Sequence, residues 1–500
     1  MKESSPIEVA QFRDLIVDRL GLQFDDTKLC QLARVLAVHA GSDGAQYLSR
    51  LAAEPALAAT WHRLAVDLTV TETYFYRSAE QIQAYAELAL PACRQARGMG
   101  GPVRVLSVGC ASGEEPYTLA IAAREAAGLG ALSVEIRAFD ANPAMLAKAA
   151  RARYTAWSLR ELRPELRERW FTRDGEFSVL SDAVRQAVMF EQHNLAQDDA
   201  ELWAPGRYDI VFCRNLLMYF SPAQAQAAVA RIASSLTPGG YLFLGHAETL
   251  RGLSNGFHLR QSHGTFYYQS KQRVGEPALL TAPGPSPWQR APIRPAQLDD
   301  PAWWGEVIAG ATQRIHALAV AVPPSNVAQP APAQPDLHQA LLSLRQEQFA
   351  QSLAQIGQLP PEHADDPDVL LLKAVSLSQS GALVPAQNVC RQLLERDELH
   401  AGAHYVLALC REGGGAVDEA LAHYRSAAYL DPGFALARLH IGVLERRRGE
   451  AEAARRDLAQ ALLLLEHEDP ARLLLFGGGF PRSALIGLCR AELAAFGAAA

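Results

Sequence analysis

The stretch that decides the fold is Val103-Arg-Val-Leu-Ser-Val-Gly-Cys-Ala-Ser-Gly-Glu-Glu-Pro-Tyr-Thr-Leu-Ala120. Its apolar run, Val103–Val108, predicts a buried strand. Gly109 and Gly113 bracket a tight loop, in which glycine lets the backbone approach a ligand closely. A helix is expected to start near Pro116, because proline is favoured in the first helical turn. The loop is neither the dinucleotide-binding GxGxxG nor a P-loop, since no Lys-Ser/Thr follows it.

Further short apolar runs follow this strand and alternate with segments of helical pattern. They are Val134–Phe139, Val188–Glu191, Asp209–Cys213 and Tyr241–Gly245, with a hairpin near Phe257–Gln261 and Thr265–Gln269 that flanks His263-Gly264. Such runs suit the buried strands of a mostly parallel sheet. The alternation therefore predicts a doubly wound, Rossmann-like α/β domain.

The chain divides into four predicted parts. Residues 1–90 have an all-helical pattern, and residues 91–270 hold the α/β domain. Residues 271–335 contain 12 of the 29 prolines and are predicted to be a linker. Within it, the apolar spacing of residues 300–322 predicts an amphipathic helix, which either packs on a neighbouring domain or docks a partner. Residues 336–500 form the fourth part.

A 34-residue repeat runs through the C-terminal part. Gly381, Gly415 and Gly449 are 34 residues apart, and so are four other sets of residues. Those sets are Ala374, Ala408 and Gly442; Ala386, Ala420 and Ala454; Cys390, Tyr424 and Leu458; and Leu393, Ala427 and Ala461. This period predicts a tetratricopeptide (TPR) solenoid. The alternative is a helical bundle without repeats.

Composition excludes several classes of protein. The net charge of −7 argues against nucleic-acid binding. No apolar run reaches the ~18 residues of a membrane span, and the first residues are too polar for a signal peptide, so no membrane insertion is expected. The seven cysteines form no CxxC pair, which predicts reduced thiols, no metal site and a cytoplasmic location.

Acidic residues near the ends of the first two strands indicate the kind of ligand. The pair Glu114-Glu115 would repel a pyrophosphate but attract an ammonium group. Asp140, at the end of the second strand, can accept hydrogen bonds from both ribose hydroxyls. Its alternative role is the N-cap of the next helix, which Asn142-Pro143 could fill instead. This combination suits S-adenosylmethionine better than a dinucleotide.

Five segments together make the resemblance to a family specific. They are SVGCASGEEPYTLAI, Thr69-Val-Thr-Glu-Thr-Tyr-Phe-Tyr-Arg77, FDANPAMLAKA, His193-Asn-Leu195 and FCRNLLMYF at 212–220. In this order they resemble the chemotaxis receptor methyltransferases of the CheR family, over about residues 10–270. The resemblance implies a class I methyltransferase domain that follows an all-α N-terminal domain. The repeats resemble those of the family's subgroup with a fused TPR array.

The resemblance also implies site residues. S-adenosylmethionine would be bound by Thr71, Thr73, Arg77, Gly109, Glu115, Asp140, Asn194, Leu195, Arg214 and Asn215, although relatives carry Asn where this chain has Thr71. Arg77 and Tyr219 would face the reacting carboxylate as catalytic residues. The alternatives are a surface salt bridge of Arg77 to Glu72 or Glu80, a structural ion pair for Arg214 and a packed aromatic role for Tyr219.

The implied activity is methylation of glutamate side chains on the cytoplasmic helices of a methyl-accepting chemoreceptor. The products would be a glutamyl methyl ester and S-adenosylhomocysteine, and the TPR groove would hold an unidentified peptide or protein. The first 90 residues carry 8 Lys+Arg against 12 Asp+Glu, so charge-driven docking by this region is expected to be weak, although Lys28 and Arg34 could line one face. Rival readings are a small-molecule methyltransferase and a non-catalytic or autoinhibited scaffold that senses S-adenosylmethionine.

Overall fold

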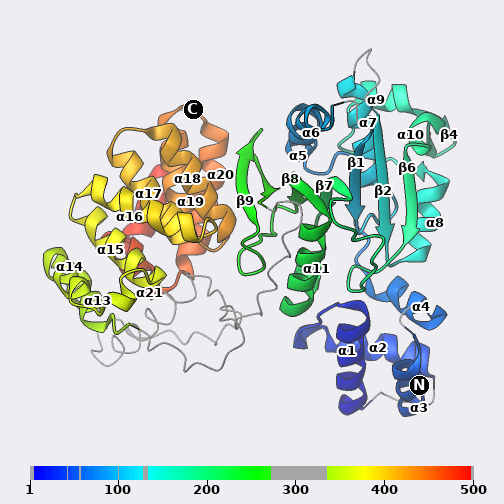
Figure 1. The fold of residues 1–500 in the computed structure, drawn as a ribbon, viewed down its shortest axis with the longest axis horizontal. Coiled ribbons are helices and arrows are strands. Elements are labelled where there is room, and N and C mark those ends of the chain that lie inside the picture. The colour runs from blue at the N-terminus through cyan, green and yellow to red at the C-terminus, as the bar shows by residue number, and fades with distance from the viewer. Residues whose placement is uncertain are drawn as a thin grey trace. The chain divides into compact units, whose positions relative to one another are not determined.

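The computed structural model describes residues 5–41, 43–55, 58–98, 101–127, 133–271 and 335–496 (Figure 1). It divides into two compact units, one of residues 1–248 and 256–282 and the other of residues 249–255 and 283–500. The N-terminal helices and the α/β sheet belong to the same unit, so the predicted boundary at residue 90 stays a prediction. The predicted helix at 300–322 lies outside the described residues.

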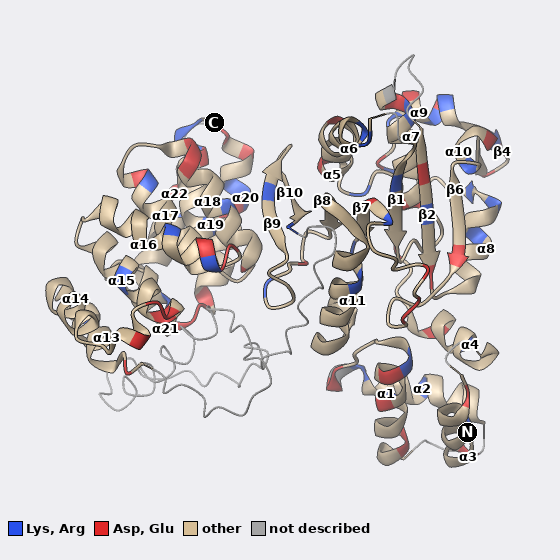
Figure 2. Cartoon of the chain, in the orientation of Figure 1, with Lys and Arg blue, Asp and Glu red and all other residues tan. Residues whose placement is uncertain are grey.

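Four helices begin the first unit: α1 (Pro6–Leu20), α2 (Leu29–Ala40), α3 (Gly44–Ala53) and α4 (Ala59–Leu68). A capping box starts α1, since the Ser5 side chain accepts from the Glu8 N–H and the Glu8 side chain accepts from Ser5. Phe12 and Ile16 on its inner face are buried, as the spacing predicts. Figure 2 shows both signs of charge on these helices, in keeping with weak charge-driven docking.

A seven-stranded sheet forms the centre of the first unit, with strand order β6-β2-β1-β7-β8-β10-β9. The strands are β1 (Val103–Val108), β2 (Val134–Asp140), β6 (Val188–Gln192), β7 (Tyr208–Cys213), β8 (Leu236–Leu244), β9 (Phe257–Ser262) and β10 (Thr265–Ser270). The first five in this order pair in parallel, whereas β10 is antiparallel to β8 and β9. The predicted mostly parallel sheet is confirmed. The strand order reverses between β1 and β7, where open α/β sheets bind their ligands.

Helices connect and cover these strands: α5 (Ala79–Ala84), the π-helical turn η2 (Tyr85–Ala89), α6 (Leu90–Arg97), α7 (Glu114–Ala127), α8 (Pro143–Arg151), α9 (Pro164–Trp170), α10 (Asp182–Arg185) and α11 (Pro222–Ser235). Residues from α5, η2 and α6 join the core of the sheet. In that core the rings of Phe212 and Phe243 stack with centroids 4.5 Å apart. Helix α7 begins at Glu114, two residues before the predicted Pro116, because the Tyr117 N–H already donates to the Gly113 carbonyl.

A second, small sheet was not predicted. It consists of β3 (Arg153–Tyr154), β5 (Phe177–Leu180) and β4 (Phe171–Asp174) in that order, all antiparallel. Two to four residues per strand are too few to give a periodic signal. Most of β4 is also exposed, so its sequence carries no apolar run.

The second unit is built from paired helices. They are α13 (His338–Arg345), α14 (Phe349–Gly357), α15 (Pro367–Gln379), α16 (Leu383–Arg396), α17 (Ala401–Gly413), α18 (Val417–Leu430), α19 (Ala435–Arg447), α20 (Ala451–Glu466), α21 (Pro470–Phe476) and α22 (Arg482–Ala494). The starts of α15, α17 and α19 are 34 residues apart, and so are those of α16, α18 and α20. This spacing confirms the predicted TPR solenoid.

The repeated small residues have two structural roles. Gly381, Gly415 and Gly449 lie in the turns within the helix pairs with φ of 81°, 80° and 81°, a conformation that favours glycine. Gly442 lies inside α19, where an added Cβ would lie 2.6 Å from Leu458 Cγ on α20. A larger residue there would force the two helices apart.

Candidate active site

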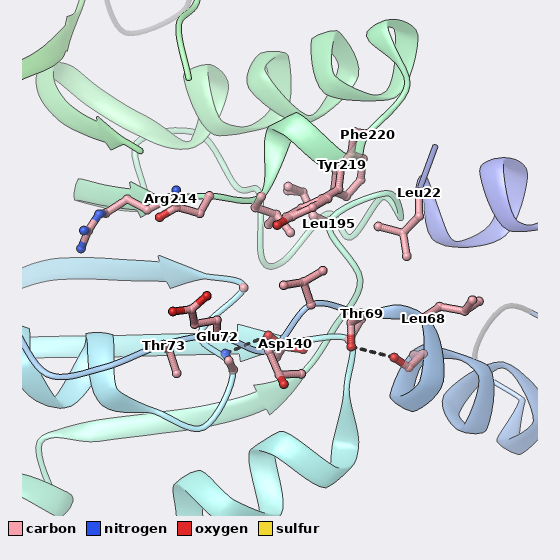
Figure 3. Close-up of a pocket in the computed structure, with 18 of the residues that line it drawn as sticks. Leu22, Leu68, Thr69, Glu72, Thr73, Asp140, Leu195, Arg214, Tyr219 and Phe220 are labelled. Atoms are coloured by element: carbon pink, nitrogen blue, oxygen red, sulfur yellow. Dashed lines mark hydrogen bonds between the residues drawn. The ribbon is translucent and has the colours of Figure 1, made fainter. Parts of the chain in front are cut away.

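A pocket in the first unit lies at the carboxyl ends of β1, β2 and β7, and every site residue predicted above lines it. Figure 3 shows its two facing walls. Arg214, Leu195 and Tyr219 lie on one wall, and Thr73, Glu72 and Asp140 lie on the other. The sheet brings these residues together because the ends of parallel strands meet at one edge.

The glycine loop after β1 forms part of the pocket floor. Gly109 has φ of 70°, and an added Cβ would lie 2.9 Å from Leu216 Cδ2. Gly113 has φ of 91°, and its Cβ would lie 2.9 Å from the Cβ of Ala149. Both positions require glycine for conformation and for space, so the loop passes closer to its neighbours than any other residue would allow.

Asp140 joins the end of β2 to the glycine loop. Its Oδ2 accepts the Ala111 N–H at 2.8 Å, and its Oδ1 accepts the Asn142 N–H at 2.7 Å. Asn142, not Asp140, is the N-cap of α8, since its side chain accepts from the backbone of that helix. Burial raises the pKa of Asp140, although the backbone hydrogen bonds oppose this shift.

Glu115 and Arg214 form a buried ion pair. Their side chains are 14% and 3% exposed, and Arg214 Nη1 lies 3.2 Å from Glu115 Oε2. The Ser107 hydroxyl donates to Glu115 Oε1 at 2.8 Å, and Arg214 Nη2 donates to the Arg77 carbonyl at 2.6 Å. Burial raises the pKa of Glu115 despite the nearby guanidinium. Arg214 thus makes the structural ion pair that was its alternative role, and it does so within the pocket.

Glu114 does not share the pocket with Glu115. It is buried, and its carboxylate accepts from the Ser112 hydroxyl at 2.8 Å. The expectation that both acids face a ligand is therefore wrong for Glu114. Its side chain leaves a different face of α7 from that of Glu115, because neighbouring residues on a helix do not face each other.

Arg77 ends the segment that carries Thr71 and Thr73 along the pocket. Its Nη1 donates to the backbone oxygen of Glu72 at 2.9 Å, so its observed contact is with the main chain and not with the Glu72 carboxylate. Its guanidinium carbon also lies 5.7 Å from the centre of the Tyr74 ring. These contacts hold the guanidinium end of the side chain beside the pocket.

Asn194 and Leu195 follow β6 and connect the sheet to the N-terminal helices. The Asn194 amide nitrogen donates to the Arg19 carbonyl at 3.0 Å, and its oxygen accepts the Ala196 N–H at 2.9 Å. Both residues are buried. The Asn194 side chain therefore has a structural role in shaping this end of the pocket.

The segment between α1 and α2 closes the pocket on the side of Tyr219. The Gln23 N–H donates to the Tyr219 carbonyl at 2.7 Å, and Leu22 bridges to Phe220. Gln23, Phe24 and Lys28 line the pocket although no sequence pattern marked Gln23 or Phe24. Only the packing of the helices on the sheet brings them there.

Glu248 is a further residue that the sequence analysis missed. Its side chain is buried and accepts N–H groups from Asn215 at 2.6 Å, Leu216 at 2.8 Å, Gly245 at 2.8 Å and Met218 at 3.3 Å. This carboxylate holds the loop after β7 that carries the pocket residues. Asn215 has φ of 56°, so the loop is kept in an uncommon conformation. The only sign of this role in the sequence is that Glu248 is an acidic residue shortly after a buried strand.

Within the described ranges, no group of His, Cys, Asp or Glu is arranged to hold a metal ion. Burial raises the pKa of the Cys110 and Cys213 thiols and lowers that of His193. These thiols are therefore protonated at neutral pH and are poor nucleophiles. In the part of the chain that is described, no helix has the length and apolar content to cross a membrane.

Comparisons with known proteins agree on one family. The model of the CheR methyltransferase SAM-binding domain matches residues 71–266. "Chemotaxis protein methyltransferase 2" of Vibrio cholerae is 37% identical over 206 residues, which cover 40% of this chain and 70% of that protein. "Probable biofilm formation methyltransferase WspC" of Pseudomonas aeruginosa is 30% identical over 453 residues, 89% of this chain and 96% of that protein.

The WspC protein of Pseudomonas putida is 30% identical over 388 residues, 77% of this chain and 82% of its own length. The two WspC matches are too long to end before the repeat region. The chain therefore belongs to the CheR family of S-adenosylmethionine-dependent methyltransferases.

Proposed function

We propose that the chain methylates glutamate side chains on the cytoplasmic helices of a methyl-accepting chemoreceptor, forming a glutamyl methyl ester and S-adenosylhomocysteine. The observation that carries the proposal is that the site residues implied by the family resemblance all line one pocket. The relatives' names, which refer to chemotaxis and biofilm formation, support a role in chemosensory signalling. The proposed substrate places the enzyme in the cytoplasm.

The pocket has the donors and acceptors that S-adenosylmethionine needs. Asp140 retains acceptor capacity for a ribose hydroxyl beyond the backbone N–H groups that it accepts, such as those of Ala111 and Asn142. Glu115 would hold the ammonium group, with Arg214 keeping it in place. Asn194 and Leu195 would flank the adenine, and Thr71, Thr73, Gly109 and Asn215 would complete the wall. When bound, the cofactor supplies an electrophilic methyl group on a sulfonium.

The acceptor needs no general base. A glutamate side chain has a pKa near ~4.3 and is already anionic at neutral pH. The chain's contribution is alignment and the exclusion of water from the carboxylate. Arg77 would orient the carboxylate through its guanidinium fork, with Tyr219 across the pocket. The apolar side chains of Leu195 and Leu216 help to keep water out.

The test is methyl transfer from labelled S-adenosylmethionine to receptor-containing membranes of the source cells, followed by mild alkali. Carboxyl methyl esters release volatile methanol, whereas N-methyl groups do not. We expect alkali-labile label on a receptor-sized band and its loss in Arg77→Ala. Arg124→Ala is the matched control, because Arg124 is an arginine on α7 that donates to Ala183 O away from the pocket. Alkali-stable label would contradict the proposal.

The repeat unit would bind a peptide or protein partner, since TPR arrays present a concave surface to such ligands. Tethering to the partner would raise the local concentration of substrate. The competing function is a scaffold that senses S-adenosylmethionine without turnover. Wild type separates the two, because a scaffold would bind S-adenosylmethionine and yet leave no methyl ester on any receptor. Asp140→Ala then separates cofactor sensing from scaffolding, because it should lose cofactor binding while partner binding stays intact.

A further inference from the structure

Arg160 lies between two aromatic rings beside the pocket. Its guanidinium carbon is 3.7 Å from the centre of the Tyr74 ring and 4.2 Å from that of the Trp157 ring. Its Nη1 also donates to the Trp157 carbonyl at 2.9 Å. A planar guanidinium is attracted to the faces of aromatic rings, so the three side chains hold one another in place. We call Tyr74, Trp157 and Arg160 the Arg160 stack.

The backbone beneath the Arg160 stack is fixed to the pocket. Leu159 is buried in the core of the sheet, next to the turn's exposed residues. The Ser158 carbonyl accepts the Phe75 N–H at 2.9 Å, and Phe75 is itself fully buried. The turn around Trp157 is therefore bonded to the 71–77 segment, of which Tyr74 lines the pocket.

Trp157 is a large aromatic residue that is exposed to solvent. Its side chain is 67% exposed, among the highest values for large apolar residues of the described chain. Single exposed apolar residues are common and mean little alone. Here the exposed ring lies with an arginine and with a tyrosine that lines the pocket, and Trp, Arg and Tyr are the residues that dominate binding hot spots.

Two guanidiniums lie against the same tyrosine ring. Arg77 approaches Tyr74 at 5.7 Å and Arg160 at 3.7 Å. The carboxylate that pairs with Arg160 is Glu72, at 3.8 Å from Nη2 and with a side chain 65% exposed. Such a long, solvated ion pair is weak, so an incoming carboxylate can replace Glu72.

We propose that the Arg160 stack binds a second carboxylate of the protein substrate, one helical turn away from the acceptor glutamate held at Arg77. This proposal rests on the proposed function and specifies the substrate as an acidic helix. Side chains three or four residues apart share one face of a helix, so a single helix can present one carboxylate to each of the two guanidiniums beside the Tyr74 ring. Trp157 covers the methylene groups of the second acidic side chain.

The test measures peptide binding, so that it does not depend on turnover. The probes are three labelled, alanine-based helical peptides, and the full chain is saturated with S-adenosylhomocysteine. The first peptide carries glutamates at positions i and i+4, the second carries glutamate at i and glutamine at i+4, and the third carries glutamates at i and i+2, which do not share a helix face. Fluorescence anisotropy gives the three affinities.

We expect wild type to bind the i,i+4 diglutamate peptide about 10-fold more tightly than either other peptide. Arg160→Gln should abolish this preference, Arg160→Lys should restore part of it, and Trp157→Ala should weaken the diglutamate peptide about 3-fold to 10-fold. Arg153→Gln is the control, because Arg153 lies 4.9 Å over the Phe177 ring in the small sheet and should leave the preference intact.

Equal affinity for the three peptides, or no binding of any of them, would overturn the proposal. So would a loss in Arg160→Gln that is the same for all three, since that indicates a general effect on folding. Unchanged affinity of every variant for S-adenosylhomocysteine shows that the pocket is intact. A clear preference for the i,i+4 diglutamate peptide, without any methyl ester on that peptide or on receptors, would count against the proposed enzyme activity. It would not count against binding by the Arg160 stack.

Discussion

Glu248 accepts the backbone N–H of Asn215 at 2.6 Å, across 33 residues of sequence. The bond ties the loop after β8 to the loop after β7, and three more N–H groups reach the same carboxylate. A carboxylate is the one side chain of this length with two acceptor oxygens and no donor. The shape of one pocket wall therefore depends on a residue that does not itself line the pocket.

Glu248→Gln is expected to lower methyl transfer about 10-fold to 100-fold, because an amide has one acceptor oxygen and places NH₂ against backbone N–H groups. The protein should also lose roughly 1–3 kcal/mol of stability. Steady-state kinetics and thermal unfolding measure the two effects. Glu201→Gln, at an exposed glutamate, should change neither. Activity per folded molecule equal to that of wild type would show that Glu248 does not position the loop.

Cofactor affinity is expected to rise as the pH is raised above the ordinary pKa of a carboxyl group. Burial raises the pKa of Glu115 and of Asp140, so each holds a proton to a higher pH than a free carboxyl does. Binding an ammonium group favours the ionised Glu115 and releases that proton. The folding stability of the ligand-free protein changes with pH in the opposite direction. Because the carboxyl pKa is raised in the folded state, stability is lost as the pH rises through that pKa.

Calorimetry in two buffers of different ionisation enthalpy tests this linkage by counting released protons. Glu115→Gln should weaken S-adenosylhomocysteine binding about 10-fold or more and reduce the pH dependence to the part that Asp140 contributes. Methylthioadenosine, which lacks the amino-acid end, should bind both proteins equally. If the variant weakened both ligands alike, Glu115 would be shaping the pocket and not holding the ammonium.

Gly109→Ala is expected to destabilise the first unit by roughly 1–3 kcal/mol and to lower cofactor affinity, because the new methyl group meets Leu216. Gly264→Ala is the matched control. Gly264 has φ of 71°, close to the 70° of Gly109, but nothing lies within 4 Å of its added Cβ. The unfolding temperature of both variants is measured with and without S-adenosylhomocysteine. Because both carry the same conformational strain, an additional loss in Gly109→Ala reports the steric overlap with Leu216. Equal losses in the two variants would leave strain as the only cause.

The repeat unit is expected to lose stability as the pH falls from about 6.5 towards 3. His400 Nδ1 accepts the Ala403 N–H at 3.0 Å and so caps α17 in its unprotonated form. Burial lowers the pKa of His400 to about 3. Because the unfolded chain binds the proton more readily, stability falls with pH below the unfolded pKa. Hydrogen exchange of α17 measures the effect.

His400→Asn retains a capping oxygen but cannot titrate. Its α17 exchange should therefore increase less between about pH 6.5 and pH 4 than that of wild type, with the remainder due to His404 and His423, whose pKa values burial also lowers. A pH profile that is the same in both proteins would assign the acid sensitivity to other groups.

The sequence predicted those parts of the fold that have a strong periodic signal. The strand Val103–Val108 and the hairpin turn His263-Gly264 were both predicted and are both observed. The 34-residue period was visible because each helix pair packs in the same way on the next. The short strands of the small sheet, such as Arg153–Tyr154, gave no such signal.

The candidate site was predictable where a residue must be of one type for local reasons, as for Gly109. Glu248 and Gln23 could not be predicted, because their roles consist of hydrogen bonds to backbone atoms far away in the sequence. Glu114 was placed wrongly for a related reason. Its acidic character was visible, but the direction in which its side chain leaves α7 depends on where that helix starts.

The hydrogen bond between Gln23 and Tyr219 has a consequence for synthesis of the chain. Gln23 leaves the ribosome early, whereas its acceptor follows almost two hundred residues later. At about 5–20 residues per second, the nascent chain spends on the order of ten seconds or more without a closed pocket. Until Tyr219 has been synthesised, the segment between α1 and α2 therefore lacks the hydrogen-bond partner that holds it against this side of the pocket.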